Sequence, residues 1–566
     1  MITIEIKKSK KLKEYNSAFL SFPYNDSIIN YLRRMPVKFY LPETKQWEIP
    51  ITLIPNFKMA FDSFGITVID NSIENQLDAR DTDLDDSLLN GYDFKTKPFE
   101  HQLFAIKYGL KYDSWFLGDE MGLGKTKTAI DIAVARKLKY GYKHCLIVCG
   151  VNTLKWNWVN EILTHSNEKP WILGQKEGRN GVVKIGSTKD KIDDLKYLLE
   201  NETTTYFIIT NIESFRDKTI ADTIKLLCDK GIINMCVFDE AHKCKNPQSQ
   251  QTKGFIKCQP KVRIAMTGTP LMNSPLDLFI IMKWLGFENH SFTAFKNHYC
   301  VMGGFGGYEV ISYKNLDELN SNLNAIMIRR LKSDVFDLPE KTYIEEYVEM
   351  LPKQEVLYKE VKANIVSSLD MINFKGDPLA SLIRLRQVTG YPGILSSEVS
   401  ESAKLDRMED LVEEAISNNQ KVLIFSNWTQ MTDIIYERLF DKQYGIMRIT
   451  GDTKDNQRQD IVNAFQNTDM CKVLLGTIGA MGTGLTLTAA TVVIFVDEPW
   501  NRALFEQAVD RCHRIGTTNN ITIYSIMCKG TIDERVHSLI YKKGVMSDAI
   551  VDNKMSSKEI LNYLLD

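Results

Sequence analysis

The chain has 566 residues, 44% hydrophobic and 25% charged, which predicts several globular domains with hydrophobic cores. Its formal net charge of −2 argues against one large basic surface, so a nucleic acid would have to bind in a local groove. The ten scattered cysteines favour buried reduced thiols over a zinc site or a disulfide framework. No signal peptide and no apolar run of about 18 residues is recognisable, so we expect no membrane contact. The expected location is cytoplasmic in a bacterial or phage-infected cell, or nuclear in a eukaryote.

Residues 1–75 predict a small α+β accessory module. A basic strand comes first, then a helix at 25–34 that stops near Pro36, then two β-rich runs that form a hairpin around the turn at 42–45. The lysine-rich strip 7–13 either contacts phosphates or lies in solvent.

A different pattern begins at residue 92, after an acidic segment over 76–91 that predicts a solvated linker. Short apolar runs alternate with longer helical segments, and each run ends in small or polar residues, as buried parallel strands do. Five runs predict a first α/β lobe over 92–290, and five more predict a second over 416–566. Residues 291–415 predict helical insertions and an inter-lobe linker. The predicted strands are 115–120, 144–150, 205–210, 235–242, 262–270, 421–427, 445–451, 472–478, 492–499 and 521–529.

The segment GDEMGLGKT, from Gly118 to Thr126, ends like a phosphate-binding loop and lies between a predicted strand and a predicted helix. In such a loop, backbone N–H groups surround the phosphates, the lysine reaches the β and γ phosphates, and the threonine hydroxyl holds Mg²⁺. The usual spacing puts a glycine where Asp119 stands. The predicted ATP-binding residues of the loop are Asp119, Gly122, Leu123, Gly124, Lys125 and Thr126.

An acidic pair more than a hundred residues further on supports a nucleotide site. Asp239 and Glu240 end the apolar run CVFDEAH. The aspartate at such a position can hold Mg²⁺, and the glutamate can position or deprotonate the attacking water. An isolated Asp-Glu pair can also cap a helix, but the preceding strand and the distance from the loop favour catalysis.

Two further segments predict contacts around the nucleotide. Gln102 can form a bidentate hydrogen bond to an adenine edge, although a solvent-facing glutamine fits the sequence as well. Thr267, Gly268 and Thr269 follow a predicted strand, where their hydroxyls can couple the nucleotide state to the rest of the protein. The same residues can form a plain turn.

The second lobe contains QAVDRCHRIG, with Gln507, Arg511 and Arg514. We expect the two arginines, three residues apart, to share one helix face and to reach one phosphate when the lobes close. Such an arginine finger accelerates phosphoryl transfer on the order of 10³-fold or more. Gln507 is assigned to coupling. The alternative is a solvated basic helix face.

Polar and aromatic residues at the ends of strands in both lobes predict phosphate contacts that do not read a base sequence. The tryptophans at 156 and 158 can equally pack in the core. The predicted DNA-binding residues are Lys155, Trp156, Asn157, Thr210, Asn211, Thr477, Gly482, Thr483 and Trp500.

Eleven motifs in order between residues 92 and 545 resemble the Swi/Snf-type ATPases, the double-strand-translocating branch of the superfamily 2 helicases. They are PFEHQ, DEMGLGKT, LKWNWVNE, DEAHKCKN, TGTPLMNSPLDL, IRRLKSDVFDLPEK, LIFSNWTQM, RITGDT, GTGLTLTAA, DEPWN and QAVDRCHRIG. In that family the loop reads DEMGLGKT, so Asp119 is the family form. The sequence departs from the family at Gly150, Thr517 and Tyr391, where proline, glutamine and histidine are usual.

The resemblance implies two RecA-like lobes with C-terminal brace helices, ATP and Mg²⁺ as cofactors, and double-stranded or branched DNA as partner. The N-terminal module resembles, more weakly, the small domain that precedes the motor in annealing helicases. We therefore expect a monomeric ATP-dependent DNA translocase that remodels branched DNA in replication, recombination or repair, with no protein partner evident. Three alternatives stay open: a strand-separating DNA or RNA helicase, a non-catalytic structure-specific DNA-binding protein, and a translocase that displaces proteins.

Overall fold

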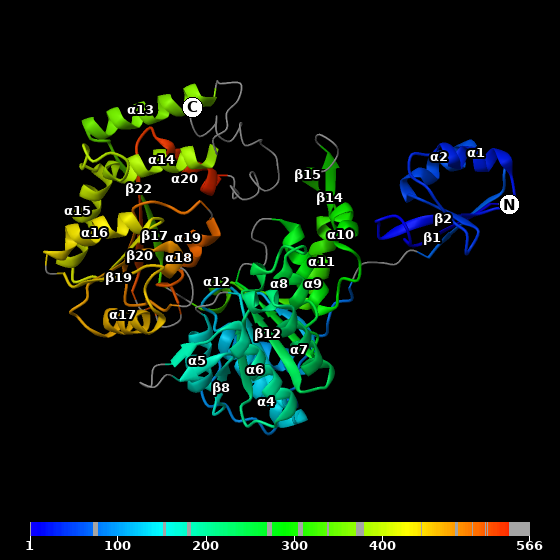
Figure 1. Ribbon diagram of the computed structural model, residues 1–566, viewed down its shortest axis with the longest axis horizontal. Helices are drawn as coiled ribbons and strands as arrows, with labels where there is room; N and C mark the ends of the chain where they lie inside the picture. The colour runs from blue at the N-terminus through cyan, green and yellow to red at the C-terminus, as the bar shows by residue number, and fades with distance from the viewer. Residues whose placement is uncertain are drawn as a thin grey trace.

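The fold is α/β, with two parallel-sheet lobes and a smaller mixed sheet at the N-terminus, as predicted (Figure 1). The computed structural model describes residues 2–71, 77–150, 154–177, 183–268, 274–303, 309–336, 339–369, 378–442, 444–481, 485–500, 502–514, 517 and 519–542. Among these residues, no helix is long and apolar enough to cross a membrane. All ten cysteines are free and buried.

The N-terminal module is a five-stranded sheet in the order β3-β4-β2-β1-β5, antiparallel except for the β1–β5 pair. The predicted helix is present as α1 (Asp26–Arg34), capped by the Asn25 side chain, and α2 (Ile54–Ala60) packs in the same hydrophobic core. The second run of the hairpin ends at Ile49, because Pro50 cannot continue the ladder. The strands are β1 (Ile2–Lys8), β2 (Asn16–Ser21), β3 (Phe39–Leu41), β4 (Gln46–Ile49) and β5 (Ile66–Asp70).

A buried carboxylate holds the lysine-rich loop between β1 and β2. Glu48 accepts hydrogen bonds from the main-chain N–H groups of Lys10 and Lys11, both at 2.8 Å, and from the Ser17 hydroxyl at 2.6 Å. Burial alone would raise the pKa of Glu48, but these hydrogen bonds outweigh it and lower the pKa. The side chains of Lys10 and Lys11 are exposed, so phosphate contact and solvation both remain open for the strip.

The end of this loop attaches the module to the first lobe. The Tyr15 ring is sandwiched between His290 and His298, with ring centroids 3.9 and 4.2 Å away. Its hydroxyl donates to Glu288 Oε2 at 2.7 Å, and Asn297 Nδ2 donates to the Lys13 carbonyl at 3.0 Å. Tyr15 is buried within the hydrophobic cluster of the first lobe, so the module is docked through an inserted aromatic side chain.

The first lobe has a seven-stranded parallel sheet in the order β16-β6-β13-β12-β7-β11-β8. Alternate side chains of a strand enter two separate hydrophobic clusters, as expected for a sheet buried on both faces. In β12, for example, Phe238 belongs to one cluster and Val237 to the other. The strands are β6 (Ser114–Leu117), β7 (His144–Cys149), β8 (Pro170–Ile172), β11 (Phe207–Asn211), β12 (Ile233–Asp239), β13 (Val262–Met266) and β16 (Met327–Ile328).

Helices cover both faces of this sheet (Figure 1). They are α3 (Glu100–Lys111), α4 (Lys125–Tyr140), α5 (Leu154–His165), α6 (Thr188–Glu200), α7 (Lys218–Asp229), α8 (Gln250–Phe255) and α9 (Leu278–Leu285). A short antiparallel pair, β9 (Gln175–Glu177) and β10 (Val183–Ile185), follows β8.

The acidic segment before the first lobe lies along α3 instead of standing free in solvent. Asp86 pairs with Lys107, and Asp81 pairs with Lys111 at 2.6 Å. Leu88 and its neighbours pack against the core of the lobe. Three leucines, Leu84, Leu88 and Leu89, make this contact from within the acidic segment.

The second lobe has a six-stranded parallel sheet in the order β17-β22-β21-β18-β20-β19. All five predicted strands are present. The sixth, β17 (Lys341–Val348), comes from the segment predicted as helical linker and pairs with β22 along its full length. The other strands are β18 (Val422–Ser426), β19 (Ile446–Ile449), β20 (Val473–Thr477), β21 (Val492–Phe495) and β22 (Ile521–Cys528).

Helices α15 (Ala403–Ser417), α16 (Thr429–Phe440), α17 (Asp455–Asn467), α18 (Ile478–Met481) and α19 (Arg502–Val509) surround this sheet. Three further helices, α13 (Pro352–Leu369), α14 (Pro378–Gly390) and α20 (Ile532–Lys542), share a hydrophobic cluster on its edge. On the first-lobe side of the junction lie α10 (Phe292–Tyr299), the hairpin β14 (Cys300–Gly303) and β15 (Glu309–Tyr313), α11 (Leu316–Ile326) and α12 (Lys332–Val335).

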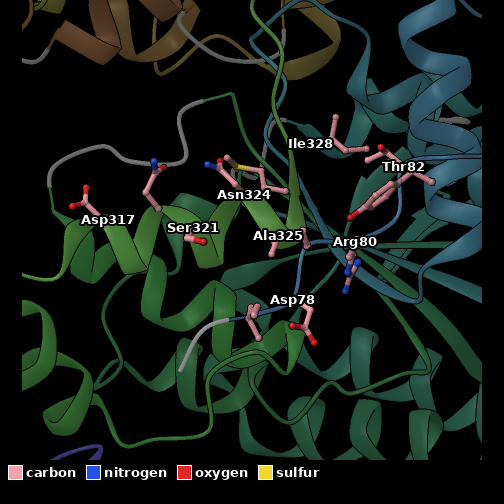
Figure 2. A pocket seen from close by; sticks show the side chains of 13 residues that line it. Asp78, Arg80, Thr82, Asp317, Ser321, Asn324, Ala325 and Ile328 are labelled. Carbon is pink, nitrogen blue, oxygen red and sulfur yellow. The ribbon is translucent and has the colours of Figure 1, made fainter. Parts of the chain in front are cut away.

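A pocket of about 650 Å³ opens between residues 77–82 and helix α11 (Figure 2). Asp78 and Arg80 line it from the first segment, and Ser321 and Asn324 from the helix. Its described lining residues do not include the phosphate-binding loop.

We expect the substitution Tyr15→Ala to release the module from the first lobe. Truncating an aromatic side chain this deeply buried costs about 3–5 kcal/mol, and the loop would also lose its hydrogen bond to Glu288. Small-angle X-ray scattering should show a larger radius of gyration. Tyr15→Phe, which keeps the stacking, is the matched control, and an unchanged radius of gyration for Tyr15→Ala would contradict this docking.

Candidate nucleotide-binding site between the lobes

The phosphate-binding loop has the geometry of an anion cradle. It connects the end of β6 at Leu117 to the start of α4 at Lys125. Gly122 and Gly124 have φ angles of +86° and +75°, a left-handed conformation that glycine adopts without strain. No side chain caps the N-terminus of α4, so its first N–H groups are available to a phosphate. Lys125 Nζ donates to the carbonyls of Asp119 at 2.8 Å and Glu120 at 3.1 Å.

Asp119 has a structural partner in the inter-lobe linker. The Arg330 guanidinium pairs with both carboxylate oxygens, through Nε to Oδ1 at 3.0 Å and through Nη2 to Oδ2. The main chains also meet, because Gly118 N donates to Ile328 O at 2.8 Å and Glu120 N to Arg330 O at 2.9 Å. The side chain of Asp119 is therefore engaged by protein, and its predicted contact with ATP stays a prediction.

The Gln102 side chain contacts the main chain of the phosphate-binding loop. Its Oε1 accepts from Phe99 N at 3.0 Å, and its Nε2 lies 3.4 Å from the carbonyls of Leu123 and Gly124. A Cβ atom at Gly124 would lie 2.2 Å from that Nε2, and the φ of Gly124 is +75°, so a larger residue would displace the Gln102 amide and strain the main chain. Gln102 is buried and Leu123 is also buried. The structure therefore brings Gln102 to the loop, while its contact with adenine remains a prediction.

The acidic pair lies at the carboxyl end of β12. Asp239 Oδ2 accepts a hydrogen bond from the Trp158 indole N–H at 2.9 Å, and Oδ1 accepts from Glu240 N at 2.9 Å. Burial and the charge of Glu240 raise the pKa of Asp239, whereas the Trp158 hydrogen bond and Lys125 oppose that rise. Glu240 has a φ of +52°, an unfavourable conformation for a non-glycine residue and one often found at functional sites.

Gly150 has a physical reason to depart from the family's usual proline. Its N–H donates to the Asp239 carbonyl at 2.8 Å, a bond that proline cannot make. A Cβ atom at this position would lie 2.6 Å from the Glu240 carbonyl oxygen. The end of β7 thus packs directly on the main chain of the acidic pair.

His242 links the acidic pair to the predicted coupling motif. Its Nδ1 lies 2.8 Å from Thr267 Oγ1 and 3.3 Å from Glu240 Oε2. Burial lowers the pKa of His242 to about 4, so the ring is neutral at neutral pH. A Cβ atom at Gly268 would lie 3.4 Å from Lys125 Nζ, which places this segment beside the loop. Thr269 lies outside the described residues, and sequence reasoning gave His242 no separate role.

The two arginines do not share a helix face. Helix α19 ends at Val509, and Arg511 and Arg514 lie in the turns that follow. In these turns the main chain forms i to i−3 hydrogen bonds, from Arg511 N to Ala508 O and from Cys512 N to Val509 O. The side chain of Arg514 nevertheless reaches the phosphate-binding loop of the first lobe. A Cβ atom at Gly122 would lie 3.3 Å from Arg514 Cγ.

The charges of both lobes act on one another at this place. Burial lowers the pKa of Lys125, Glu240 raises it and Arg514 lowers it. Burial and the neighbouring Arg514 lower the pKa of Arg511 to about 9, while Glu240 opposes that shift. Gln507, on α19, is buried. Lys125 and Glu240 of the first lobe thus lie within electrostatic reach of Arg511 and Arg514 of the second, an arrangement that we call the composite site.

The residues present fit ATP and Mg²⁺. The loop offers left-handed glycines, an uncapped helix N-terminus and Lys125 to phosphate. Thr126 at the start of α4 and Asp239 supply oxygen ligands, which Mg²⁺ prefers. These two residues would hold the metal.

Several predicted DNA contacts are buried. Lys155 and Thr210 are each 1% exposed, and Asn211 and Thr477 are also buried, which argues against direct contact of these side chains with a phosphate. Trp156 and Asn157 are half-buried on α5. Trp500 lies under the Arg386 guanidinium, 4.6 Å from the ring centroid. Gly482 and Thr483 lie outside the described residues.

Residues 99–394, more than half of the chain, match the SNF2-related domain, and residues 403–516 match the helicase conserved C-terminal domain. The chain therefore belongs to the SNF2-related family, which confirms the resemblance seen in the motifs.

Three relatives illustrate the range of similar proteins. The chain is 27% identical to Protein CHROMATIN REMODELING 24 of Arabidopsis thaliana, over 79% of this chain and 45% of that protein. It is 27% identical to the putative ATP-dependent helicase/translocase YwqA of Bacillus subtilis, over 79% and 48%. It is 25% identical to the DNA annealing helicase and endonuclease ZRANB3 of Mus musculus, over 81% and 41%. The chain spans less than half the length of these relatives.

Among solved structures, the Sulfolobus solfataricus SWI2/SNF2 ATPase core in complex with dsDNA is 25% identical. The match covers 84% of this chain and 98% of that one, with a TM-score of 0.37.

We expect Trp158→Phe to weaken Mg²⁺-dependent nucleotide binding about 10-fold, because loss of a residue that orients a metal ligand typically costs 10- to 100-fold in affinity. The change keeps an aromatic ring in the core and removes the N–H that orients Asp239. ATP affinity measured by calorimetry with and without Mg²⁺ tests this. Trp156→Phe, two residues away on α5 and half-buried, is the control. Equal loss of affinity in the presence and absence of Mg²⁺ would contradict this role.

Proposed function

We propose that the chain is a DNA-dependent ATPase whose two lobes close on ATP and translocate along double-stranded DNA. The observation that carries this proposal is the composite site. Arg514 lies against Gly122 of the phosphate-binding loop, and Lys125 and Glu240 of the first lobe lie within electrostatic reach of Arg511 and Arg514 of the second. A site split between two mobile lobes makes hydrolysis depend on their relative position, as a motor requires.

Each residue has a role that follows from its position. Lys125 and the N–H groups of the loop bind the phosphates, and Thr126 and Asp239 hold Mg²⁺, which offsets the phosphate charge when bound. Glu240 orients the attacking water and accepts its proton. Arg511 and Arg514 stabilise the charge that develops on the transferred phosphoryl group. Glu240, His242 and Thr267 form the hydrogen-bonded path through which the nucleotide state reaches the rest of the first lobe.

We propose further that the work is remodelling of branched DNA, by fork regression, branch migration or strand annealing. Two observations support it. One similar protein is named a DNA annealing helicase and endonuclease, and another a putative ATP-dependent helicase/translocase. The N-terminal module is docked on the first lobe through Tyr15, and its loop presents exposed lysines, which suit phosphate contacts.

ATP turnover should be stimulated by duplex and forked DNA, and this stimulation should fall steeply with salt because phosphate contacts release counterions. The measurement is steady-state hydrolysis with duplex DNA, forked DNA, single-stranded DNA and RNA. Glu240→Gln should bind ATP and lose about 10²- to 10⁴-fold in turnover, and Lys125→Ala should lose binding as well. Stimulation by single strands or RNA alone would replace the duplex translocase with a strand-separating helicase, and no turnover in any condition would favour a non-catalytic DNA-binding protein.

Deleting residues 1–75 should remove a preference for forked over linear DNA and leave turnover on linear duplex largely unchanged. The preference is the ratio of the two turnover rates at equal DNA concentration. Because the deletion exposes the surface that Tyr15 covers, Tyr15→Ala in the full chain is the companion variant. If the ratio of turnover on forked DNA to turnover on linear DNA is the same in both variants as in the unchanged chain, the module does not recognise branched DNA.

A further inference from the structure

One linker residue touches the catalytic apparatus of both lobes. Lys332 lies at the start of α12 and is 5% exposed. Its main-chain N–H donates to Glu120 Oε2 in the phosphate-binding loop at 2.7 Å. Its Nζ donates to Asp510 Oδ1 at 2.7 Å and to the His513 carbonyl at 2.9 Å. The main chain of Lys332 is thus tied to the loop, and its side chain to residues 510–514, which we call the arginine segment.

The loop end of this connection is held by an ion pair and several hydrogen bonds. Arg330, two residues before Lys332, pairs with the buried Asp119 carboxylate, and the main chain at 328–330 is hydrogen-bonded to the main chain of the loop. Arg329 Nη1 adds a bond to the Gly118 carbonyl at 2.8 Å. Charge-assisted bonds of this kind are stronger than neutral ones. The linker therefore moves with the loop.

The other end is fixed by Asp510. This carboxylate accepts from Lys332 and from Lys341 of β17 at 3.2 Å, and Arg514 Nε donates to the Asp510 carbonyl at 3.0 Å. Burial alone would raise the pKa of Asp510, but the two lysines outweigh it and lower the pKa. Asp510 directly precedes Arg511, so its position sets where both arginines of the segment lie.

The connection through Lys332 opposes the electrostatic repulsion among the cations of the site. Besides burial, the positive charge of Arg514 lowers the pKa of Arg511 and that of Lys125. Three cations repel one another when no phosphate is between them. The attraction of Lys332 for Asp510 holds the arginine segment against the loop in spite of that repulsion.

From these contacts we propose that Lys332 is a positioning residue, which fixes the arginine segment against the phosphate-binding loop so that Arg511 and Arg514 reach the transferred phosphoryl group. The inference rests on the proposed ATPase function and adds a residue to it. Lys332 does not itself contact the phosphates in this assignment. Its loss should therefore lower kcat and leave the KM for ATP nearly unchanged.

The first experiment compares two buried lysines. Lys332→Met should lower DNA-stimulated kcat about 10- to 100-fold, the usual effect of displacing a catalytic group by about 1 Å. The matched control is Lys404→Met. It removes the ion pair between Lys404 Nζ and Asp533 Oδ2, 2.6 Å apart, which is buried like the Lys332–Asp510 pair but lies within the second lobe. The control should lose thermal stability and keep kcat. Equal losses of kcat in both variants, or a rise in DNA-independent turnover of Lys332→Met, would overturn the proposal.

A double-mutant cycle assigns the effect to the pair. Asp510→Asn should lower kcat by a similar factor, and the double variant Lys332→Met with Asp510→Asn should be little worse than either single one, because both remove the same interaction. Multiplying effects would overturn the assignment of Lys332 to Asp510.

A measurement without hydrolysis separates this proposal from the proposed function. Spin labels on Leu163→Cys of α5 and Phe440→Cys of α16, both exposed, report the inter-lobe distance, and the native cysteines are buried. The distance distribution should be narrower in the otherwise unchanged chain and in Lys404→Met than in Lys332→Met. Identical distributions would overturn the positioning role. Should the unchanged chain not hydrolyse ATP with any DNA, the ATPase function fails while this distance measurement still decides whether Lys332 holds the lobes.

Discussion

The ion pair between Asp119 and Arg330 is the constraint on which the rest of the site depends. It joins residues 211 positions apart and lies where the phosphate-binding loop meets the chain that leaves the first lobe. A buried pair of charges is stabilising only when hydrogen bonds satisfy both partners. Here the carboxylate also accepts from Arg330 N at 3.1 Å, and the neighbouring main chains are bonded to one another. The loop therefore gains a fixed edge that an ordinary glycine at 119 could not provide.

From this edge the electrostatics of the site extend into both lobes. Lys125 is held by the carbonyls of the loop itself, and Asp239 is oriented by Trp158 from the neighbouring helix. Glu240 adopts a left-handed backbone that aims its carboxylate at His242 and Thr267. Burial disfavours the charged forms of Lys125, Asp239 and Arg511, and so shifts the pKa of each toward its neutral form. A bound nucleotide, with its own negative charge, would offset the repulsion among the cations.

Much of this architecture could be predicted from the sequence, and the exceptions have physical causes. Short apolar runs that end in small or polar residues predicted ten strands of the two lobes, and all ten are present. Strand β17 was missed because its side chains alternate between half-buried and exposed and include several charges, as expected at the edge of a sheet. The phosphate-binding loop and the acidic pair were predicted because their chemistry requires fixed spacing.

The residues that could not be predicted depend on tertiary contacts. Nothing near Asp119 in the sequence identifies Arg330 as its partner, and Trp158 looked as much like core packing as like a functional residue. The helix that was to carry Arg511 and Arg514 ends before them, a boundary that local patterns locate poorly. Thr210 lies near the end of β11 and Lys155 at the start of α5, but such positions inside a packed lobe need not be open to a ligand.

The insertion of Tyr15 between two histidines fixes more than the place of a small domain. Because the module is attached to the first lobe, its distance from the phosphate-binding loop and its orientation toward it would stay the same when the second lobe moves. With the proposed function, the module would then set a fixed distance along the DNA. A DNA junction held on it would lie a set number of base pairs from the point where the motor pulls, and the length of that arm would decide which branch is drawn in.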